Sequence, residues 1–248
     1  MYNDEIISYL DLVNEEKAHL QKGMNFRVGK TYSVFLMSVR INAPYADQID
    51  KKTGTLIYEG HDHPKTRYVT DPKSIDQPMT TPAGSWTENG KFFKAAMDYK
   101  SGLVNKPELI KVYEKIVAGV WCYKGFFELV NAKQASDGKR TVFKFYLKPI
   151  VKGFLGGTVE LSQNRIIPTY VKVEVWKRDK GKCQICDSTT NLHYDHIIPF
   201  SKGGSSLTSK NIRLLCVKHN LEKSDKIMIF LPWISVGVSA LELHKTRC

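Results

Sequence analysis

Three short motifs between residues 183 and 220 decide the fold of the C-terminal part: Cys183-Gln-Ile-Cys186, Leu192-His-Tyr-Asp-His-Ile-Ile-Pro199 and Asn211-Ile-Arg-Leu-Leu-Cys-Val-Lys-His-Asn220. They contain two pairs of metal-ligating residues, each pair separated by two positions: Cys183 with Cys186, and Cys216 with His219. Four such side chains make a tetrahedral zinc site. The interval between the pairs is longer than in simple zinc fingers, so we expect the middle motif to carry a second function.

The motifs resemble those of HNH (ββα-metal) endonucleases, and the resemblance spans nearly all of residues 168–226. In that family a β-hairpin and a helix hold one catalytic divalent ion. The resemblance implies that Asp195 ligates this ion and that His196 deprotonates the attacking water. It also implies that Asn211 fixes the loop and helps to orient the histidine. Asn220 stands at the last motif position as the second metal ligand, which makes the chain an HNN variant.

The chemistry of phosphodiester hydrolysis accounts for these residue types. The reaction needs a base near the water and a cation at the phosphate. Histidine titrates near neutrality, and oxygen ligands suit Mg²⁺ or Mn²⁺. By the same resemblance, Lys202 and Lys223 stand where phosphate contacts are expected, whereas His193 is out of phase with Asp195 and is expected to be structural. A non-cutting zinc knuckle would explain the zinc ligands but not the pair Asp195-His196.

Composition limits the setting in which this chemistry takes place. The 248 residues can form two modest domains. The net charge of +12 fits a polyanionic partner, although a merely basic surface explains the charge equally well. An odd number of cysteines, five, argues against a disulfide framework. With no apolar run of about 18 residues and no signal peptide, we expect a cytoplasmic protein without a membrane span.

The N-terminal part has a mixed α+β pattern. Apolar spacing predicts a helix over 2–22 that ends at Gly23, and further helices over 89–99 and 107–115. Alternating aromatic and aliphatic residues predict strands over 32–40, 55–58, 120–130 and 140–147. The stretch 61–85 is rich in turn residues and predicts a long loop, which in a compact domain is usually functional. The expected divisions are 1–22 helix, 23–148 domain, 149–167 linker, 168–226 nuclease domain and 227–248 tail.

Several segments of residues 23–148 resemble SRA (YDG) domains, which have a curved, PUA-like β-barrel. Residues 120–130 and 142–147 are similar to the Tyr-Asp-Gly signature region, and residues 42–50 and 56–60 to the strands of the base pocket. The stretch that begins at Trp86 is similar to the one that follows the pocket in that family. The resemblance implies that a modified cytosine is flipped out of the duplex and held between aromatic rings.

Carried over residue by residue, the resemblance gives a candidate base pocket. Tyr45 and Tyr58 would stack on the base, unless they are ordinary strand aromatics. Asp47 or Gln48 would read the exocyclic amine, since a carboxylate accepts from cytosine N4. The sequence departs from the family in its Tyr123-Lys-Gly signature, and Glu59 replaces a small threonine, which changes the accepted 5-substituent or the base itself.

Three functions remain open at this stage. The first is a modification-dependent, type IV-like restriction endonuclease that recognises 5-methylcytosine or 5-hydroxymethylcytosine in double-stranded DNA. The second is a sequence-specific or homing-type HNH endonuclease indifferent to modification, and the third is a non-catalytic reader of modified DNA. One HNH site cuts one strand at a time, so the N-terminal helix and the apolar tail are candidate surfaces for a homodimer.

Overall fold

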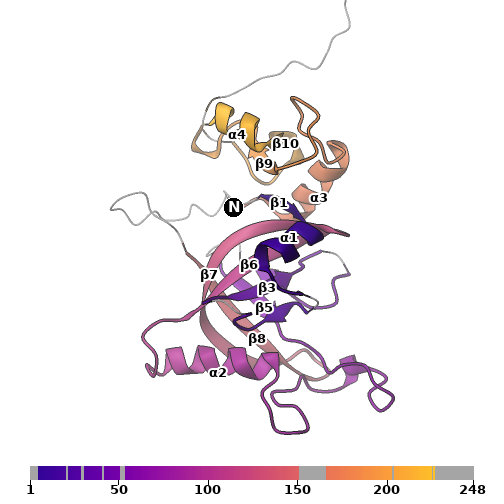
Figure 1. Ribbon diagram of the computed structural model, residues 1–248, viewed down its shortest axis with the longest axis vertical. Helices are drawn as coiled ribbons and strands as arrows, with labels where there is room; N and C mark the ends of the chain where they lie inside the picture. Colours follow the sequence, from indigo (N-terminus) through magenta and orange to yellow (C-terminus); the bar gives the residue numbers. More distant parts are fainter. Residues whose placement is uncertain are drawn as a thin grey trace, which may run out of the picture.

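The computed structural model describes residues 5–20, 22–28, 31–40, 42–50, 54–150, 166–202, 204–224 and 226. The fold is α+β: a large curved sheet is formed by residues before 150, and a small two-stranded unit with two helices follows it (Figure 1). The predicted linker is described only at its two ends, and the tail 227–248 lies outside the described residues. No helix among the described residues has both the length and the apolar character that crossing a membrane requires.

Eight strands form the large sheet: β1 Ile6–Ser8, β2 Met24–Asn25, β3 Ser33–Met37, β4 Gln48–Ile49, β5 Leu56–Glu59, β6 Glu108–Val117, β7 Val120–Ser136 and β8 Thr141–Pro149. The order is β2-β3-β6-β7-β8-β5-β4, with β1 paired to the start of β7. The β3–β6 pair is parallel and the other pairs are antiparallel. Register shifts in the β6–β7 and β7–β8 ladders mark bulges, which bend a strand and increase its twist.

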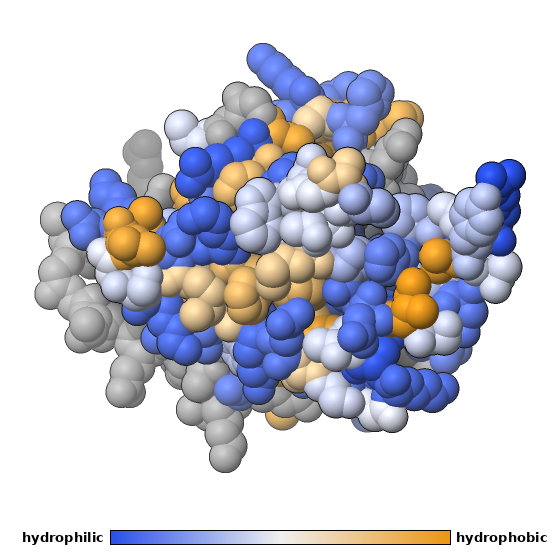
Figure 2. All heavy atoms as spheres, turned by 90° about the horizontal axis from the view of Figure 1, so that it is seen from below, coloured by the Kyte–Doolittle hydropathy of each residue, from blue (hydrophilic) through white to orange (hydrophobic). Residues whose placement is uncertain are grey.

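The core of this part lies between the curved sheet and helix α2, Glu88–Lys100 (Figure 1). Thr87 caps α2 by accepting the amide of Gly90, and Phe92 and Ala96 are fully buried on the inner face of the helix. Viewed from the α2 end, the surface is largely hydrophilic around a short band of apolar residues (Figure 2). Helix α1, Tyr9–Glu16, packs on the opposite side of the sheet through Leu12.

Most predicted elements are found, but two predictions need correction. The stretch 107–115 is not a helix: it belongs to β6, a central strand between β3 and β7. Its charged residues are buried in the sheet: Glu108 against Arg27 and Ser33, and Lys111 against Glu16. The N-terminal helix is shorter than predicted, because residues 6–8 form β1 instead.

The small unit consists of α3 Thr169–Arg178, β9 Leu192–His196, β10 Ile212–Cys216 and α4 Val217–Lys223. The β9–β10 hairpin pairs Asp195 with Arg213 and His196 with Ile212. Short 3-10 turns occupy the connection between the strands at Phe200–Lys202 and Ser209–Asn211, and another, Pro72–Ser74, lies in the long loop before α2. The hairpin and α4 together have the ββα arrangement that the sequence motifs imply.

Candidate active site and candidate binding cavity

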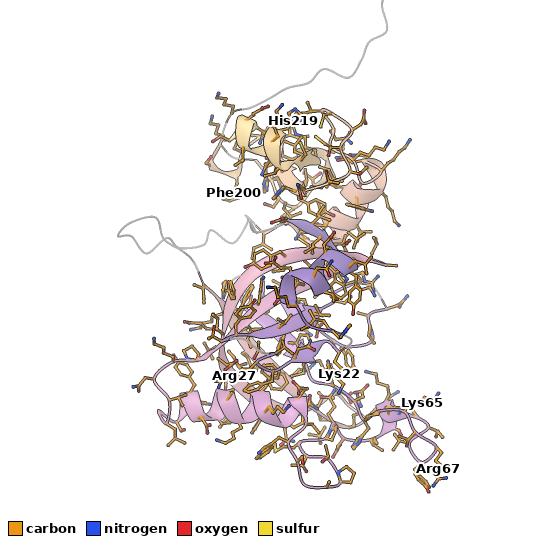
Figure 3. The ribbon with its side chains drawn as sticks, viewed as in Figure 1. Lys22, Arg27, Lys65, Arg67, Phe200 and His219 are labelled. Atoms are coloured by element: carbon orange, nitrogen blue, oxygen red, sulfur yellow. The ribbon has the colours of Figure 1, made fainter. Side chains whose placement is uncertain are left out.

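Four ligand atoms from two separate segments meet beside the β9–β10 hairpin (Figure 3 labels His219 among them). Cys183 and Cys186 come from the turn after α3, Cys216 ends β10 and His219 lies in α4. His219 Nδ1 lies 3.5 Å from Cys183 Sγ and 3.3 Å from Cys216 Sγ, and the Sγ atoms of Cys186 and Cys216 are 3.8 Å apart. A tetrahedral zinc ion with bonds of about 2.0–2.3 Å holds its ligands about 3.3–3.8 Å apart. These three distances match that spacing, and all four ligand atoms lie within 4.8 Å of one another, so the cluster has the chemistry and the size of a zinc site.

Asp195 sits at the centre of a small charged cluster on β9. Its Oδ1 atom lies 2.8 Å from Lys223 Nζ, and its Oδ2 atom lies 3.4 Å from Arg213 Nε. Lys223 also donates a hydrogen bond to the backbone carbonyl of His196. The Lys223 side chain is only 1% exposed. The geometry thus places Lys223 inside the site, where it ties α4 to β9, and does not favour the phosphate contact expected for it.

Asn220 and Lys223 belong to the same helix, three residues apart. Side chains with this spacing lie on one helix face, so Asn220 is carried on the face of α4 that meets Asp195. A carboxylate and an amide oxygen are donors that suit Mg²⁺ or Mn²⁺. A carboxylate has about four acceptor positions, so the ion pairs of Asp195 leave room for a metal bond. Asp195 and Asn220 as ligands of a divalent ion therefore stay a prediction.

The loop after β9 holds the histidine that follows Asp195. His196 Nε2 lies 2.8 Å from Ser206 Oγ. The Asn211 side chain accepts from the amide of Ile198 and donates to the carbonyls of Ile198 and Ser205, at 2.9–3.1 Å. Gly204 packs so tightly that an added Cβ would lie 1.8 Å from the Ile198 oxygen. Asn211 therefore holds the loop by three hydrogen bonds. Ser206, which contacts the His196 ring, was not singled out from the sequence.

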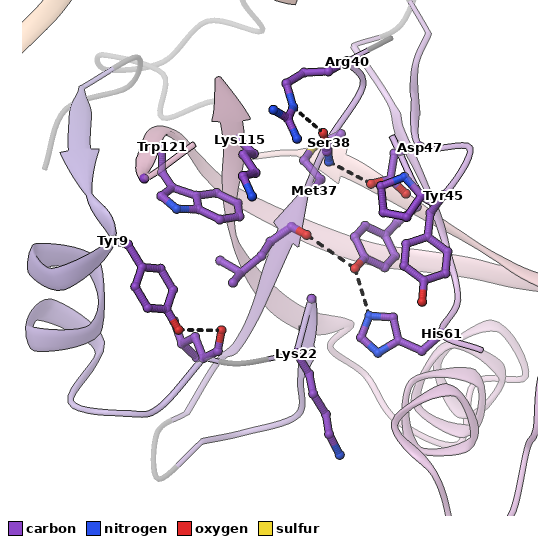
Figure 4. Close-up of a pocket in the computed structure, with 16 residues that line it drawn as sticks. Tyr9, Lys22, Met37, Ser38, Arg40, Tyr45, Asp47, His61, Lys115 and Trp121 are labelled. Carbon is purple, nitrogen blue, oxygen red and sulfur yellow. Dashed lines mark hydrogen bonds between the residues drawn. The ribbon is translucent and has the colours of Figure 1, made fainter. Parts of the chain in front are cut away.

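A cavity of about 550 Å³ opens in the N-terminal sheet, a volume typical of small-ligand sites (Figure 4). Tyr45 and His61 lie on one side of it, and Tyr9, Lys115 and Trp121 line the other (Figure 4). Tyr58 also lines the cavity. The rings of Tyr45 and His61 are stacked with centroids 5.7 Å apart, and the Tyr58 hydroxyl lies 3.2 Å from His61 Nε2. Lys73 covers Tyr45, with Nζ 4.1 Å from the ring centroid.

Asp47 lies on the wall of this cavity in a fixed orientation. Its two carboxylate oxygens accept hydrogen bonds from the backbone amides of Ser38, at 2.9 Å, and Glu59, at 3.0 Å. Burial nevertheless raises the pKa of Asp47 to about 7, because the loss of hydration outweighs these two bonds. Burial also lowers the pKa of His61 to about 4, so this ring is neutral at physiological pH. Near neutral pH, Asp47 therefore changes its protonation state, whereas His61 stays neutral.

Two of the five predicted base-contacting residues do not line the cavity. Gln48 is exposed on the edge strand β4. Glu59 is buried, but it points to the opposite side of β5, where it pairs with Lys144 at 2.7 Å and accepts from the amide of Ala46. The alternation of side chains along β5 explains this, because Tyr58 faces the cavity and its neighbour must face away.

Some residues at the two sites escaped the sequence interpretation. His61, Lys115 and Trp121 line the cavity. The sequence places His61 only in the predicted loop 61–85 and Trp121 only in the predicted strand 120–130. The signal for His61 was its position two residues after the end of β5 and three residues from Tyr58, within reach of the Tyr58 hydroxyl. Lys202 is exposed in its 3-10 turn, whereas His193 is 3% exposed, as a structural role requires.

Comparison with known proteins identifies the C-terminal unit. Residues 183–226 match the family model described as HNH endonuclease. This segment is therefore an HNH endonuclease domain. No curated protein matches the chain significantly.

Three solved structures are similar to all or part of this chain. The SRA domain of SUVH5 in complex with hemimethylated CG DNA is 21% identical, over 65% of this chain and 93% of that one, with a TM-score of 0.42. The DNA modification-dependent restriction endonuclease AspBHI is 19% identical, over 60% and 42%, with a TM-score of 0.42. The type IV phosphorothioation-dependent restriction endonuclease ScoMcrA is 14% identical, over 91% and 57%, with a TM-score of 0.40. SRA structures are thus among the matches, as the sequence resemblance predicts.

Proposed function

We propose that this protein is a modification-dependent DNA endonuclease. Residues 23–148 bind a modified cytosine, 5-methylcytosine or 5-hydroxymethylcytosine, that has been flipped out of a DNA duplex. Residues 168–226 then hydrolyse phosphodiester bonds nearby. The observation that carries the proposal is the convergence of Tyr45, Asp47 and Tyr58 in one cavity of a chain that also contains an HNH endonuclease domain.

The cavity supplies what recognition of a flipped pyrimidine requires. Tyr45, which is partly exposed, offers a ring to the base once Lys73 moves aside, and base–aromatic stacking contributes about 1–3 kcal/mol per base. Tyr58 is 2% exposed and supports the wall through its contact with His61. Asp47 is held by two backbone amides and so presents its remaining lone pairs in a fixed direction. An ionised carboxylate accepts from the cytosine N4 amine, which a thymine lacks. Lys22 and Arg40 at the cavity rim add positive charge for the flanking phosphates.

The HNH domain supplies the hydrolysis. His196, oriented by Ser206, takes the proton of the attacking water. Asp195 and Asn220 hold a divalent ion, Mg²⁺ or Mn²⁺, which when bound offsets charge at the scissile phosphate. Lys223 keeps Asp195 in place by its ion pair, and Lys202, exposed after the histidine strand, contacts the DNA backbone. The Cys183–Cys186–Cys216–His219 set holds a structural zinc ion that closes the hairpin onto α4.

A binding experiment separates this proposal from a sequence-specific nuclease. The His196→Ala variant removes the base but none of the residues that line the cavity. We expect it to bind a duplex with one 5-methylcytosine or 5-hydroxymethylcytosine more tightly than the same unmodified duplex, measured by fluorescence anisotropy. Adding Tyr45→Ala is expected to abolish that preference. Equal affinity for all three duplexes would favour recognition of sequence alone.

A further inference from the structure

The β6–β7 hairpin has two faces with different partners. Lys115, Gly119 and Trp121 line the cavity. Glu114, Ile116 and Cys122 point the other way, as side-chain alternation in strands requires. The register agrees, because Lys115 lies opposite Trp121 and Glu114 opposite Cys122, and directly paired residues share a face. The β6–β7 hairpin therefore lines the cavity with one face and packs against other residues with its opposite face.

The HNH domain packs on that second face and shares a core with it. Ile116 and Cys122, both fully buried, belong to the same cluster as Val171 and Val175 of α3 and Leu192 and Tyr194 of β9. Buried apolar contacts of this kind contribute about 25 cal/mol per Å² of area removed from water. A domain attached only by a flexible linker would have no such common core.

Buried polar groups also connect α3 to the β6–β7 hairpin. Lys172 of α3 is 0% exposed, with Nζ 3.5 Å from Glu114 Oε2 and 3.4 Å from Cys122 Sγ. Thr169 donates a hydrogen bond to Glu114 Oε1. Lys124 of β7 also lies 3.8 Å from Glu114 Oε2, and removing one partner of a buried ion pair is destabilising. The α3 helix is thus fixed in both position and rotation against β6.

The first strand adds a third link. Ile6 of β1 pairs with Cys122 and packs in the shared core, while Ile7 pairs with Trp121 and packs in the cluster beneath α1. Glu5 forms a β-bridge with His193, two residues before Asp195. In Figure 1, β1 lies between the large sheet and β9. A continuous path of paired backbone therefore runs from the cavity wall to the strand that carries the catalytic residues.

We propose that the β6–β7 hairpin, with Lys172 and Glu114 as positioning residues, fixes the distance between the cavity and the HNH centre, so that DNA is cut at one defined spacing from the bound base. This inference rests on the proposed function. It differs from a tethered nuclease, which would cut over a broad window set by the length of its linker.

The cleavage test uses the full-length zinc-loaded protein and a DNA fragment with a single 5-methylcytosine or 5-hydroxymethylcytosine, with the cut ends sequenced. We expect the parent chain to give one dominant position on each cut strand. Lys172→Met is expected to spread the cuts to neighbouring positions, and Lys177→Met, on the exposed face of the same helix, to leave them unchanged. A dispersed pattern in the parent chain would overturn the proposal, as would an unchanged pattern in Lys172→Met.

Hydrogen exchange of the same proteins tests the docking without any cleavage. In Lys172→Met we expect the amides of residues 114–122 to exchange about tenfold faster or more, while those of β8 stay unchanged. If the single variant does not fold, the double variant Glu114→Gln/Lys172→Met is measured instead; it removes this ion pair and leaves only Lys124 charged there. Unchanged exchange at residues 114–122 would refute the docking. Cutting that ignores modification would refute the proposed function instead, and the exchange result would still decide the docking.

Discussion

Replacement of Asp47 by asparagine should make the protein more stable at alkaline pH than the parent chain. Burial raises the pKa of Asp47 to about 7, from 3.8 in an unfolded chain. The folded state therefore binds this proton more tightly, so between about pH 4 and 7 the unfolded state holds fewer protons and stability falls as pH rises. A difference of about three in pKa corresponds to about 4 kcal/mol lost above pH 7.

The asparagine side chain avoids this loss because it carries no charge, but it gives up part of the hydrogen bonding. Its amide oxygen accepts from only one of the two backbone amides, and a buried donor without a partner costs about 1–3 kcal/mol. We therefore expect the Asp47→Asn variant to be about 1–3 kcal/mol more stable than the parent at pH 8 and to lose that advantage near pH 5. Binding of a modified cytosine by the parent should strengthen as pH rises through 7, because the ionised carboxylate is the acceptor.

Urea unfolding at pH 5, 6, 7 and 8, followed by tryptophan fluorescence, measures the difference between the two proteins. Asp98→Asn serves as the control, since this carboxylate pairs with Lys94 on the exposed side of α2. The control should keep a constant difference from the parent over the whole pH range. If the Asp47→Asn difference is also constant with pH, Asp47 does not titrate near neutrality and the reasoning fails.

Four further predictions concern the HNH domain. His196→Ala should lower the cleavage rate by about 10²–10⁴-fold with zinc content unchanged, in single-turnover assays; an unaffected rate would exclude it as the base. Lys202→Ala should weaken binding to all duplexes alike and reduce the slope of log affinity against log salt by about one, in a salt titration. Lys223→Met should destabilise the protein in chemical denaturation by less than the ~3–5 kcal/mol that a buried charge left alone costs, because Asp195 keeps Arg213 as a partner. Cys216→Ser should lose zinc, measured by elemental analysis, and with it the protection of the β9–β10 amides against hydrogen exchange.

The sequence predicted the HNH domain well because its chemistry depends on local spacing. The two zinc pairs, Asp195-His196 and Asn211 each occupy fixed positions in short motifs, and the hairpin brings them together with little help from the rest of the chain. Lys223 was less predictable. Its place in the sequence suggested a surface contact, and only the packing of α4 on β9 turns its ammonium group inward to Asp195.

In the N-terminal part, sequence pattern alone did not predict some elements and contacts. Residues 107–115 have charges at helical spacing, and nothing local reveals that those charges find buried partners elsewhere in the fold. Likewise, Asp47 and Gln48 were equally good candidates by residue type to contact the exocyclic amine of the base. The fold buries Asp47 and exposes Gln48. The docking of the HNH domain on β6 and β7 joins residues far apart in the chain, such as Thr169 and Glu114, and no sequence period records that contact.

The most direct test of the central claim is cleavage of one plasmid prepared in unmodified, 5-methylcytosine and 5-hydroxymethylcytosine forms, with Mg²⁺ or Mn²⁺ and with His196→Ala in parallel. We expect the parent chain to cut only modified plasmid and the variant to cut none. Equal cutting of all three forms would leave the nuclease in place and contradict recognition of a modified base by the cavity.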